Sequence, residues 1–137
     1  MPREKAMQMS ANALAFLGDA VFELYVRKLV FGEGKHGTER MHKEKAAIVN
    51  AKAQAGLLAR IAPLLTEEEQ DIVRRGRNAK HHTTAKHQTV HDYNQATGLE
   101  ALCGFLYLQG ETVRLCELLR AGLPDSQMIR GSGNTIS

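Results

Sequence analysis

Apolar residues near the start of the chain recur every three or four positions. They are Leu14, Leu17, Val21 and Leu24. This spacing places apolar side chains on one face of an α-helix. Ser10 is a favourable N-cap before this run, and Gly32 is a favourable residue to end it. The pattern therefore predicts a long amphipathic helix over residues 11–31.

Two more helices are predicted in the middle of the chain. An alanine-rich run predicts one over residues 39–61, which ends before Pro63. Its expected packing face is narrow and consists of Ala46, Val49, Ala53 and Leu57. Thr66 and Glu69 have the spacing of a capping box, so a third helix is predicted from residue 67 towards residue 75.

The helical pattern fails over residues 76–90, which predicts a long loop. A fourth helix is then predicted from about residue 91 to residue 109, and a fifth over residues 111–121. Gly122 and Pro124 are typical residues to end the last helix. No alternating strand pattern is found, so the sequence predicts an all-α fold.

Length and composition fit a single domain with a working core. The chain has 137 residues, of which 43% are hydrophobic and 24% are charged, which predicts one domain over residues 1–124 and a flexible tail over 125–137. Cys103 and Cys116 lie in apolar helical runs without CxxC spacing, which favours reduced core thiols. No membrane span or secretion signal is visible, so we expect a cytoplasmic protein.

Positive charge is concentrated in one segment. The chain as a whole, with 18 basic and 15 acidic residues, is only mildly basic. Between Ile72 and His91, however, there is no acidic residue and there are five cations, which we call the basic segment: Arg74, Arg75, Arg77, Lys80 and Lys86. A basic loop suits contacts with nucleic-acid phosphates, although charge alone is equally compatible with a solvated loop.

Two acidic residues stand beside glycines inside predicted helices. Gly18 in mid-helix costs roughly 1 kcal/mol relative to alanine, which suggests that another helix approaches closely there. Asp19 follows it, and Glu100 has Gly104 one turn away. If the two helices meet, their carboxylates would form a site for a hard divalent cation. From spacing alone, the alternative is that both are partly exposed or paired helix acids.

Four segments resemble the ribonuclease III endonuclease-domain family. They are ALAFLGDAV at 13–21, NAKAQAGLL at 50–58, RRGRNAK at 74–80 and ATGLEALCGFLYL at 96–108. Because no double-stranded-RNA-binding domain accompanies them, the sequence is most similar to the Mini-ribonuclease III subfamily. The resemblance implies the compact multi-helix fold of that endonuclease domain.

The resemblance also implies roles for particular residues. Asp19 and Glu100 match the catalytic carboxylates that hold magnesium, or manganese, in the family. Two further family acids are replaced by Ala15 and Thr97, as in the Mini-subfamily, which leaves the number and coordination of the metal ions open. Phe16 matches the aromatic residue that inserts into the partner subunit of a homodimer; the alternative is an ordinary core phenylalanine.

The implied activity is metal-dependent cleavage of double-stranded RNA, leaving a 5′-phosphate and a 3′-hydroxyl. The family resemblance points to maturation of precursor large-subunit (23S) ribosomal RNA, with the basic segment contacting the duplex. One alternative is a non-cleaving structured-RNA-binding or ribosome-assembly protein with the same fold. Another is a helical interaction module without nucleic acid, which leaves the basic segment and the glycine-flanked acids unexplained.

Overall fold

The computed structural model describes residues 1–32, 37–79 and 89–123, and within them it contains helices and no strand. The α-helices are α1 (Arg3–Met7), α2 (Ala11–Phe31), α3 (Thr38–Ile48), α4 (Ala51–Ile61), α5 (Glu67–Arg77), α6 (Val90–Leu108) and α7 (Thr112–Gly122), with a 3-10 turn at Ala62–Leu64. The all-α prediction is confirmed. The predicted tail, residues 125–137, lies outside the described residues.

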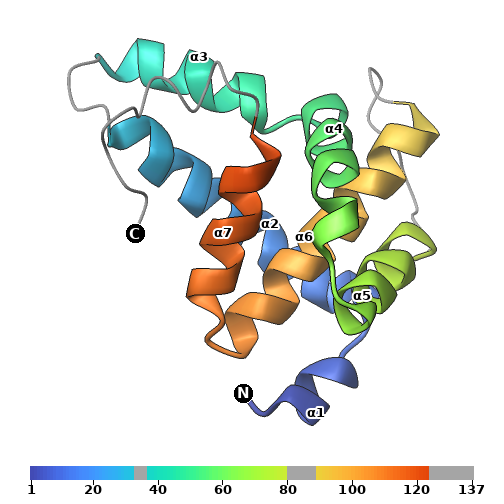
Figure 1. Ribbon diagram of the computed structural model, residues 1–137. Helices are drawn as coiled ribbons and strands as arrows, with labels where there is room; N and C mark the ends of the chain where they lie inside the picture. The colour runs from blue at the N-terminus through green and yellow to red at the C-terminus, as the bar shows by residue number, and fades with distance from the viewer. Residues whose placement is uncertain (33–36, 80–88, 124–137) are drawn as a thin grey trace.

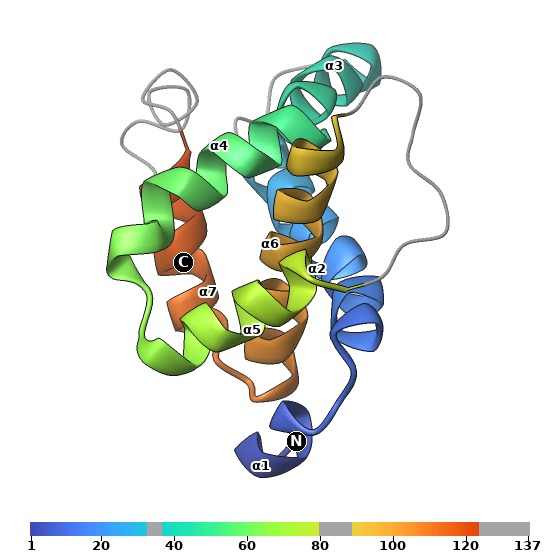
Figure 2. The ribbon, with the colours of Figure 1, turned by 90° about the vertical axis from the view of Figure 1, so that its right-hand side faces the viewer.

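Helix α6 forms the centre of the molecule. It packs most extensively against α2, α5 and α4, and it also contacts α7. In Figure 2, α6 runs down the middle with α2 on its right and with α4 and α5 on its left. Leu99, Leu102 and Phe105 are each at most 1% exposed, because neighbouring helices cover α6 on several sides.

Capping residues confirm the predicted ends of α2 and the predicted start of α5, whereas Gly122, predicted to follow the last helix, is the final residue of α7. Ser10 caps α2 by accepting a hydrogen bond from the amide of Ala13, and Gly32 follows its last residue. Thr66 and Glu69 form the complete capping box of α5. None of the described helices is both long and apolar enough to cross a membrane.

The prediction of one helix over residues 39–61 is wrong, because the chain breaks between α3 and α4 at Val49 and Asn50. The side-chain oxygen of Asn50 accepts a hydrogen bond from the amide of Ala53, which caps the start of α4. Its side-chain nitrogen donates to the carbonyl oxygens of Ala46 and Ala47 at the end of α3. Asn50 therefore satisfies backbone groups of both helices and stabilises the break.

The predicted packing faces are only partly right. Leu24, which the spacing predicts on the core face of α2, is 61% exposed. The buried residues of α2 are Leu14, Ala15, Gly18, Val21, Phe22, Val26 and Val30. Those of α4 are Ala51, Gln54, Leu57, Leu58 and Ile61, so only Leu57 was predicted correctly. Both faces are set by contact with α6, which periodicity within one helix does not specify.

The N-terminal segment is tied to the body by polar contacts that the sequence did not predict. The guanidinium of Arg75 donates hydrogen bonds to the backbone oxygens of Met7, at 3.0 Å, and Met9, at 2.6 Å. The terminal amino group of Met1 donates to the backbone oxygen of Leu108 at 2.7 Å. In Figure 1, α1 accordingly lies below the ends of α5 and α6.

The cysteines are free thiols, as predicted, although only one is fully in the core. Cys103 is buried in α6, whereas Cys116 is half-buried in α7. Burial, and the nearby Glu100 carboxyl, raise the pKa of the Cys103 thiol far above its ordinary value. Cys103 therefore packs as a small apolar side chain rather than acting as a nucleophile.

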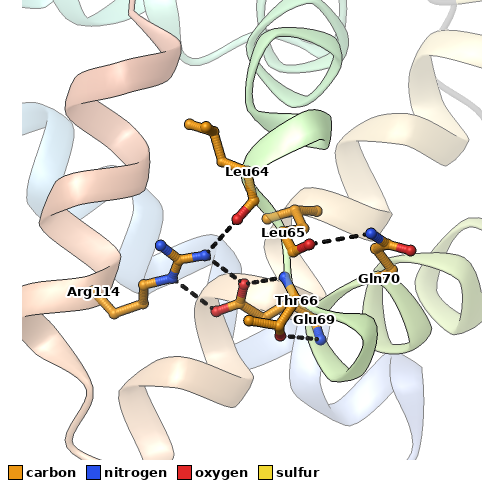
Figure 3. Close-up of polar contacts among 6 residues, drawn as sticks. All are labelled: Leu64, Leu65, Thr66, Glu69, Gln70 and Arg114. Carbon is orange, nitrogen blue, oxygen red and sulfur yellow. Dashed lines mark hydrogen bonds and ion pairs between the residues drawn. The ribbon is translucent and has the colours of Figure 1, made fainter.

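A buried ion pair joins α5 to α7, as Figure 3 shows. Glu69 is 5% exposed and accepts hydrogen bonds from Nε of Arg114 at 3.0 Å and from its Nη2 at 2.7 Å. Burial of Glu69 opposes its charge, but the hydrogen bonds from Arg114 and Thr66 outweigh this and lower the pKa of the carboxyl. The capping carboxylate of α5 thus also anchors α7.

Replacing Glu69 with Gln is expected to lower the free energy of unfolding by about 2–4 kcal/mol near neutral pH, because Arg114 keeps a half-buried charge without its partner. Because the folded-state pKa of Glu69 is lowered, its contribution is present above the ordinary pKa of 4.5 and is lost as the pH falls towards the folded-state value. Urea unfolding of the wild type and of Glu69→Gln should show that the difference in their free energies of unfolding becomes smaller in acid.

Glu68→Gln is the matched control, since Glu68 pairs with Arg3 on the surface at 2.6 Å. An exposed pair contributes about 0–1 kcal/mol, so this variant should unfold almost like the wild type. Equal losses in the two variants would contradict the role assigned to the buried pair.

Candidate active site

Asp19 and Glu100 meet where α2 crosses α6. A Cβ atom added to Gly18 would lie 1.6 Å from the backbone oxygen of Glu100, and one added to Gly104 would lie 2.1 Å from the backbone oxygen of Leu14. The two backbones are therefore in direct contact, which only glycine allows. Asp19, next to Gly18, is brought to the Glu100 side chain, and the expected meeting of these two helices is confirmed.

The two carboxyl groups interact strongly. The pKa of Glu100 is raised to about 8, chiefly by burial and further by the charge of Asp19 and the hydrogen bond with it. A hydrogen bond from Nε2 of Gln54 to Oε2 of Glu100, at 3.4 Å, acts in the opposite direction. Near neutral pH the Glu100 carboxyl therefore holds a proton, and it shares a hydrogen bond with Asp19.

Gln54 is a site residue that is not among the residues predicted from the sequence. Its side chain is 4% exposed and reaches the site from α4, so that α2, α4 and α6 each supply one polar side chain. A signal was present in the sequence, because Gln54 stands at helical spacing with Ala51, Leu58 and Ile61. One amide among apolar residues on a helix face indicates a specific buried partner.

The chemistry of the site fits a hard divalent cation. Within residues 1–32, 37–79 and 89–123, no group of three or more His, Cys, Asp or Glu side chains gathers, and Asp19 and Glu100 form a pair. The Thr97 hydroxyl donates to the Tyr93 backbone oxygen at 3.0 Å, so it is engaged within its own helix. Magnesium binds through one or two carboxylates and keeps several waters, and a cation would replace the proton that Glu100 carries.

The described part of the basic segment surrounds the end of α5 without forming one cluster. Arg74 pairs with Asp71, and Arg75 is engaged by the N-terminal backbone. Arg77 is exposed, and its side-chain stem lies beside Gly98 of α6. Lys80 and Lys86 lie outside the described residues.

Phe16 is not a core residue of the monomer, since it is 85% exposed. It precedes Asp19 by one helical turn. Leu24 and Phe31, which follow at eight and fifteen positions, are also exposed, by 61% and 71%. At 3.6 residues per turn, these three side chains lie on the same side of α2. We call them the apolar stripe of α2.

The sequence of the chain also matches a known protein family, in agreement with the fold and the paired acids on crossing helices. The Ribonuclease III domain family matches residues 12–111, which include both Asp19 and Glu100. The chain therefore belongs to the ribonuclease III family and is an endoribonuclease.

Within that family, the chain is similar to proteins named Mini-ribonuclease 3. The one from Thermoanaerobacter sp. is 48% identical over 119 residues, which cover 87% of this chain and 84% of the relative. The one from Symbiobacterium thermophilum is 46% identical over 108 residues, covering 79% and 83%. The crystal structure of protein FN1578 from Fusobacterium nucleatum is also similar, with a TM-score of 0.76 and 33% identity over 90% of this chain and 94% of that one. The expected family and fold are confirmed.

Proposed function

We propose that this endoribonuclease cleaves double-stranded RNA at a metal site formed by Asp19 and Glu100. The observation that carries the proposal is the contact of these two carboxyl groups across the glycine crossing of α2 and α6. Such a pair is costly to maintain, because burial and like charge both oppose ionisation of Glu100. Carboxyl groups with strongly perturbed pKa values are concentrated at functional sites.

The residues present define what the protein contributes to the reaction. Bound magnesium, or manganese, would supply Lewis-acid activation of water and stabilisation of charge on the phosphate. Asp19 and Glu100 would hold the ion through their oxygen atoms, and Glu100 would release its proton when the ion binds. The rigid backbone contact at Gly18 fixes the separation of the two side chains. Hydrolysis is expected to leave a 5′-phosphate and a 3′-hydroxyl.

The direct test compares a long RNA duplex with single-stranded RNA of the same sequence, each incubated with magnesium and with a chelator. We expect cleavage of the duplex with magnesium alone, and Asp19→Asn should bind the duplex without cutting it. Binding without cleavage by the wild type would instead favour a structured-RNA-binding or ribosome-assembly protein. Equal cleavage of both RNAs would contradict the proposed substrate class.

The natural substrate proposed here is precursor 23S ribosomal RNA in the cytoplasm. This proposal is supported by the resemblance of the sequence motifs to the Mini-ribonuclease III subfamily. Mapping the ends of 23S ribosomal RNA in cells depleted of the protein tests it, since unprocessed ends should accumulate.

The exposed end of α5 is the proposed contact with the RNA backbone. Arg77→Ala is expected to weaken duplex binding similarly for all sequences and to make the salt slope shallower by about one, because one phosphate contact is lost. Binding titrations at several salt concentrations, with a chelator to prevent cleavage, measure both quantities.

Arg75→Ala provides a contrast within the same helix. It removes the hydrogen bonds to Met7 and Met9, so it should lower the unfolding temperature more than Arg77→Ala does. If Arg77→Ala left affinity and salt slope unchanged, the end of α5 would be only a solvated surface.

We also propose that the protein is a homodimer and that the apolar stripe of α2 lies in its interface. Exposed Phe16, Leu24 and Phe31 would leave an apolar surface uncovered in a monomer. A twofold axis through this surface would place two sites symmetrically, which suits the two strands of a duplex.

Phe16→Lys is expected to yield a folded monomer with reduced cleavage. Phe16 makes little contact within its own subunit, so the monomer should still fold, whereas the lysine would place a charge in the interface. Val113→Lys on α7 is the matched control, since Val113 is likewise 74% exposed. Mass in solution and paired end-mapping of both strands provide the readout. An active dimer of Phe16→Lys would remove Phe16 from the interface.

A further inference from the structure

Only three polar side chains are buried in the described part of the chain: Gln54, Glu69 and Thr97. Two of them have structural partners. Glu69 binds Arg114 and caps α5, and the Thr97 hydroxyl binds the Tyr93 backbone oxygen within α6. The partner of Gln54 is instead the Glu100 carboxyl of the candidate site.

The buried position of Gln54 is unfavourable for an amide side chain unless its hydrogen-bond partner has a function. Gln54 lies on the face of α4 that packs against the core, beside Leu57 and Leu58, where an apolar side chain of similar size would be favourable. Burying an amide without adequate hydrogen bonds destabilises the folded protein. Its hydrogen bond to Glu100 spans 3.4 Å, which is longer than the usual range of about 2.7–3.2 Å for an N–H donor and an oxygen acceptor. Fold stability therefore gives little reason for Gln54.

The geometry gives a functional reason. The terminal torsion of a glutamate side chain is broad, so Glu100 alone would sample several carboxylate orientations. Nε2 of Gln54 donates to one defined oxygen, Oε2, and Gln54 itself is held because α4 is fixed at its start by the Asn50 cap.

We propose that Gln54 is a positioning residue, which orients the Glu100 carboxylate for the divalent cation without contacting the RNA. This inference rests on the proposed function of Asp19 and Glu100. Because outer partners of metal ligands typically contribute 10–100-fold to metal affinity or activity, the effect should be seen in the metal dependence of the reaction.

The test uses Gln54→Leu and Gln54→Met, which keep the volume and remove the hydrogen bond; methionine also adapts its shape if leucine does not pack. We expect the magnesium concentration for half-maximal single-turnover cleavage to rise by about 10–100-fold. High magnesium should largely restore the rate. The unfolding temperature and duplex affinity in chelator should stay close to those of the wild type, which a merely structural role would not produce.

Gln109→Leu is the matched control, because Gln109 also donates a part-buried amide hydrogen bond, to the backbone oxygen of Phe105 at the far end of α6. It should not alter the magnesium dependence. An unchanged magnesium dependence in Gln54→Leu and Gln54→Met, with Glu100→Gln inactive, would overturn the role of Gln54 alone. Full activity of Glu100→Gln would instead overturn the proposed site.

Discussion

Replacing Glu100 with Gln is expected to abolish RNA cleavage and, at the same time, to stabilise the metal-free protein in alkaline solution. The amide removes the negative charge that would bind the cation. We therefore expect the cleavage rate to fall at least 1,000-fold, which corresponds to about 4 kcal/mol in the activation free energy. The amide also copies the protonated carboxyl, because its NH2 group can donate to Asp19 as the proton of Glu100 does.

The gain in stability follows from the raised pKa. Burial first, and Asp19 second, raise the pKa of Glu100 from 4.5 to about 8 in the folded protein. The folded state therefore holds more protons than the unfolded state between these values, and wild-type stability falls as the pH rises through this window. Glu100→Gln has no such proton to lose. Its advantage should be absent below the ordinary pKa, grow through the window and reach on the order of a few kcal/mol above it.

Urea unfolding in chelator across this pH range, together with cleavage assays, measures both effects. Magnesium should raise the unfolding temperature of the wild type but not that of Glu100→Gln. Glu117→Gln, on the exposed face of α7, controls for the general effect of removing one negative charge. A variant that cleaves normally, or that is less stable than the wild type in alkali, would contradict the paired-carboxyl site.

Gly18→Ala is expected to destabilise the protein by at least about 3–5 kcal/mol, and Gly104→Ala similarly, because a methyl group would have to occupy space held by backbone atoms. The added Cβ of residue 18 would lie 1.6 Å from the Glu100 backbone oxygen, and that of residue 104 would lie 2.1 Å from the Leu14 backbone oxygen. Backbone of two packed helices has no rotamer by which to move aside, so α2 and α6 must separate.

Separation of these helices also disrupts the site, since Asp19 and Glu100 stand on the two sides of the contact. Any Gly18→Ala protein that still folds should therefore bind magnesium more weakly and show little cleavage. Gly56→Ala in α4 is the matched control: its Cβ would meet only the flexible end of Arg60 at 3.3 Å, and alanine is the better helix former. Thermal unfolding compares them, and a neutral Gly18→Ala would refute the close crossing.

Helix ends were predictable because their causes are local. Ser10 and the Thr66–Glu69 pair satisfy amides within one turn of their own position, so sequence alone contains both partners. The break at Asn50 was missed although it is also a cap, because the alanine-rich residues on both sides have high helix propensity and the apolar pattern gave no reason to interrupt them.

The sequence by itself determined the helical class, most helix boundaries, the family resemblance and the prominence of Asp19, Glu100 and Gly18. Only the tertiary structure decided which faces of α2 and α4 are buried, that Arg75 binds the N-terminal backbone, and that Gln54 reaches Glu100. The physical reason is the separation along the sequence over which each kind of interaction acts. Caps and periodicity act between residues a few positions apart, whereas Gln54 and Glu100 are 46 positions apart and meet only because α6 is packed against both α2 and α4.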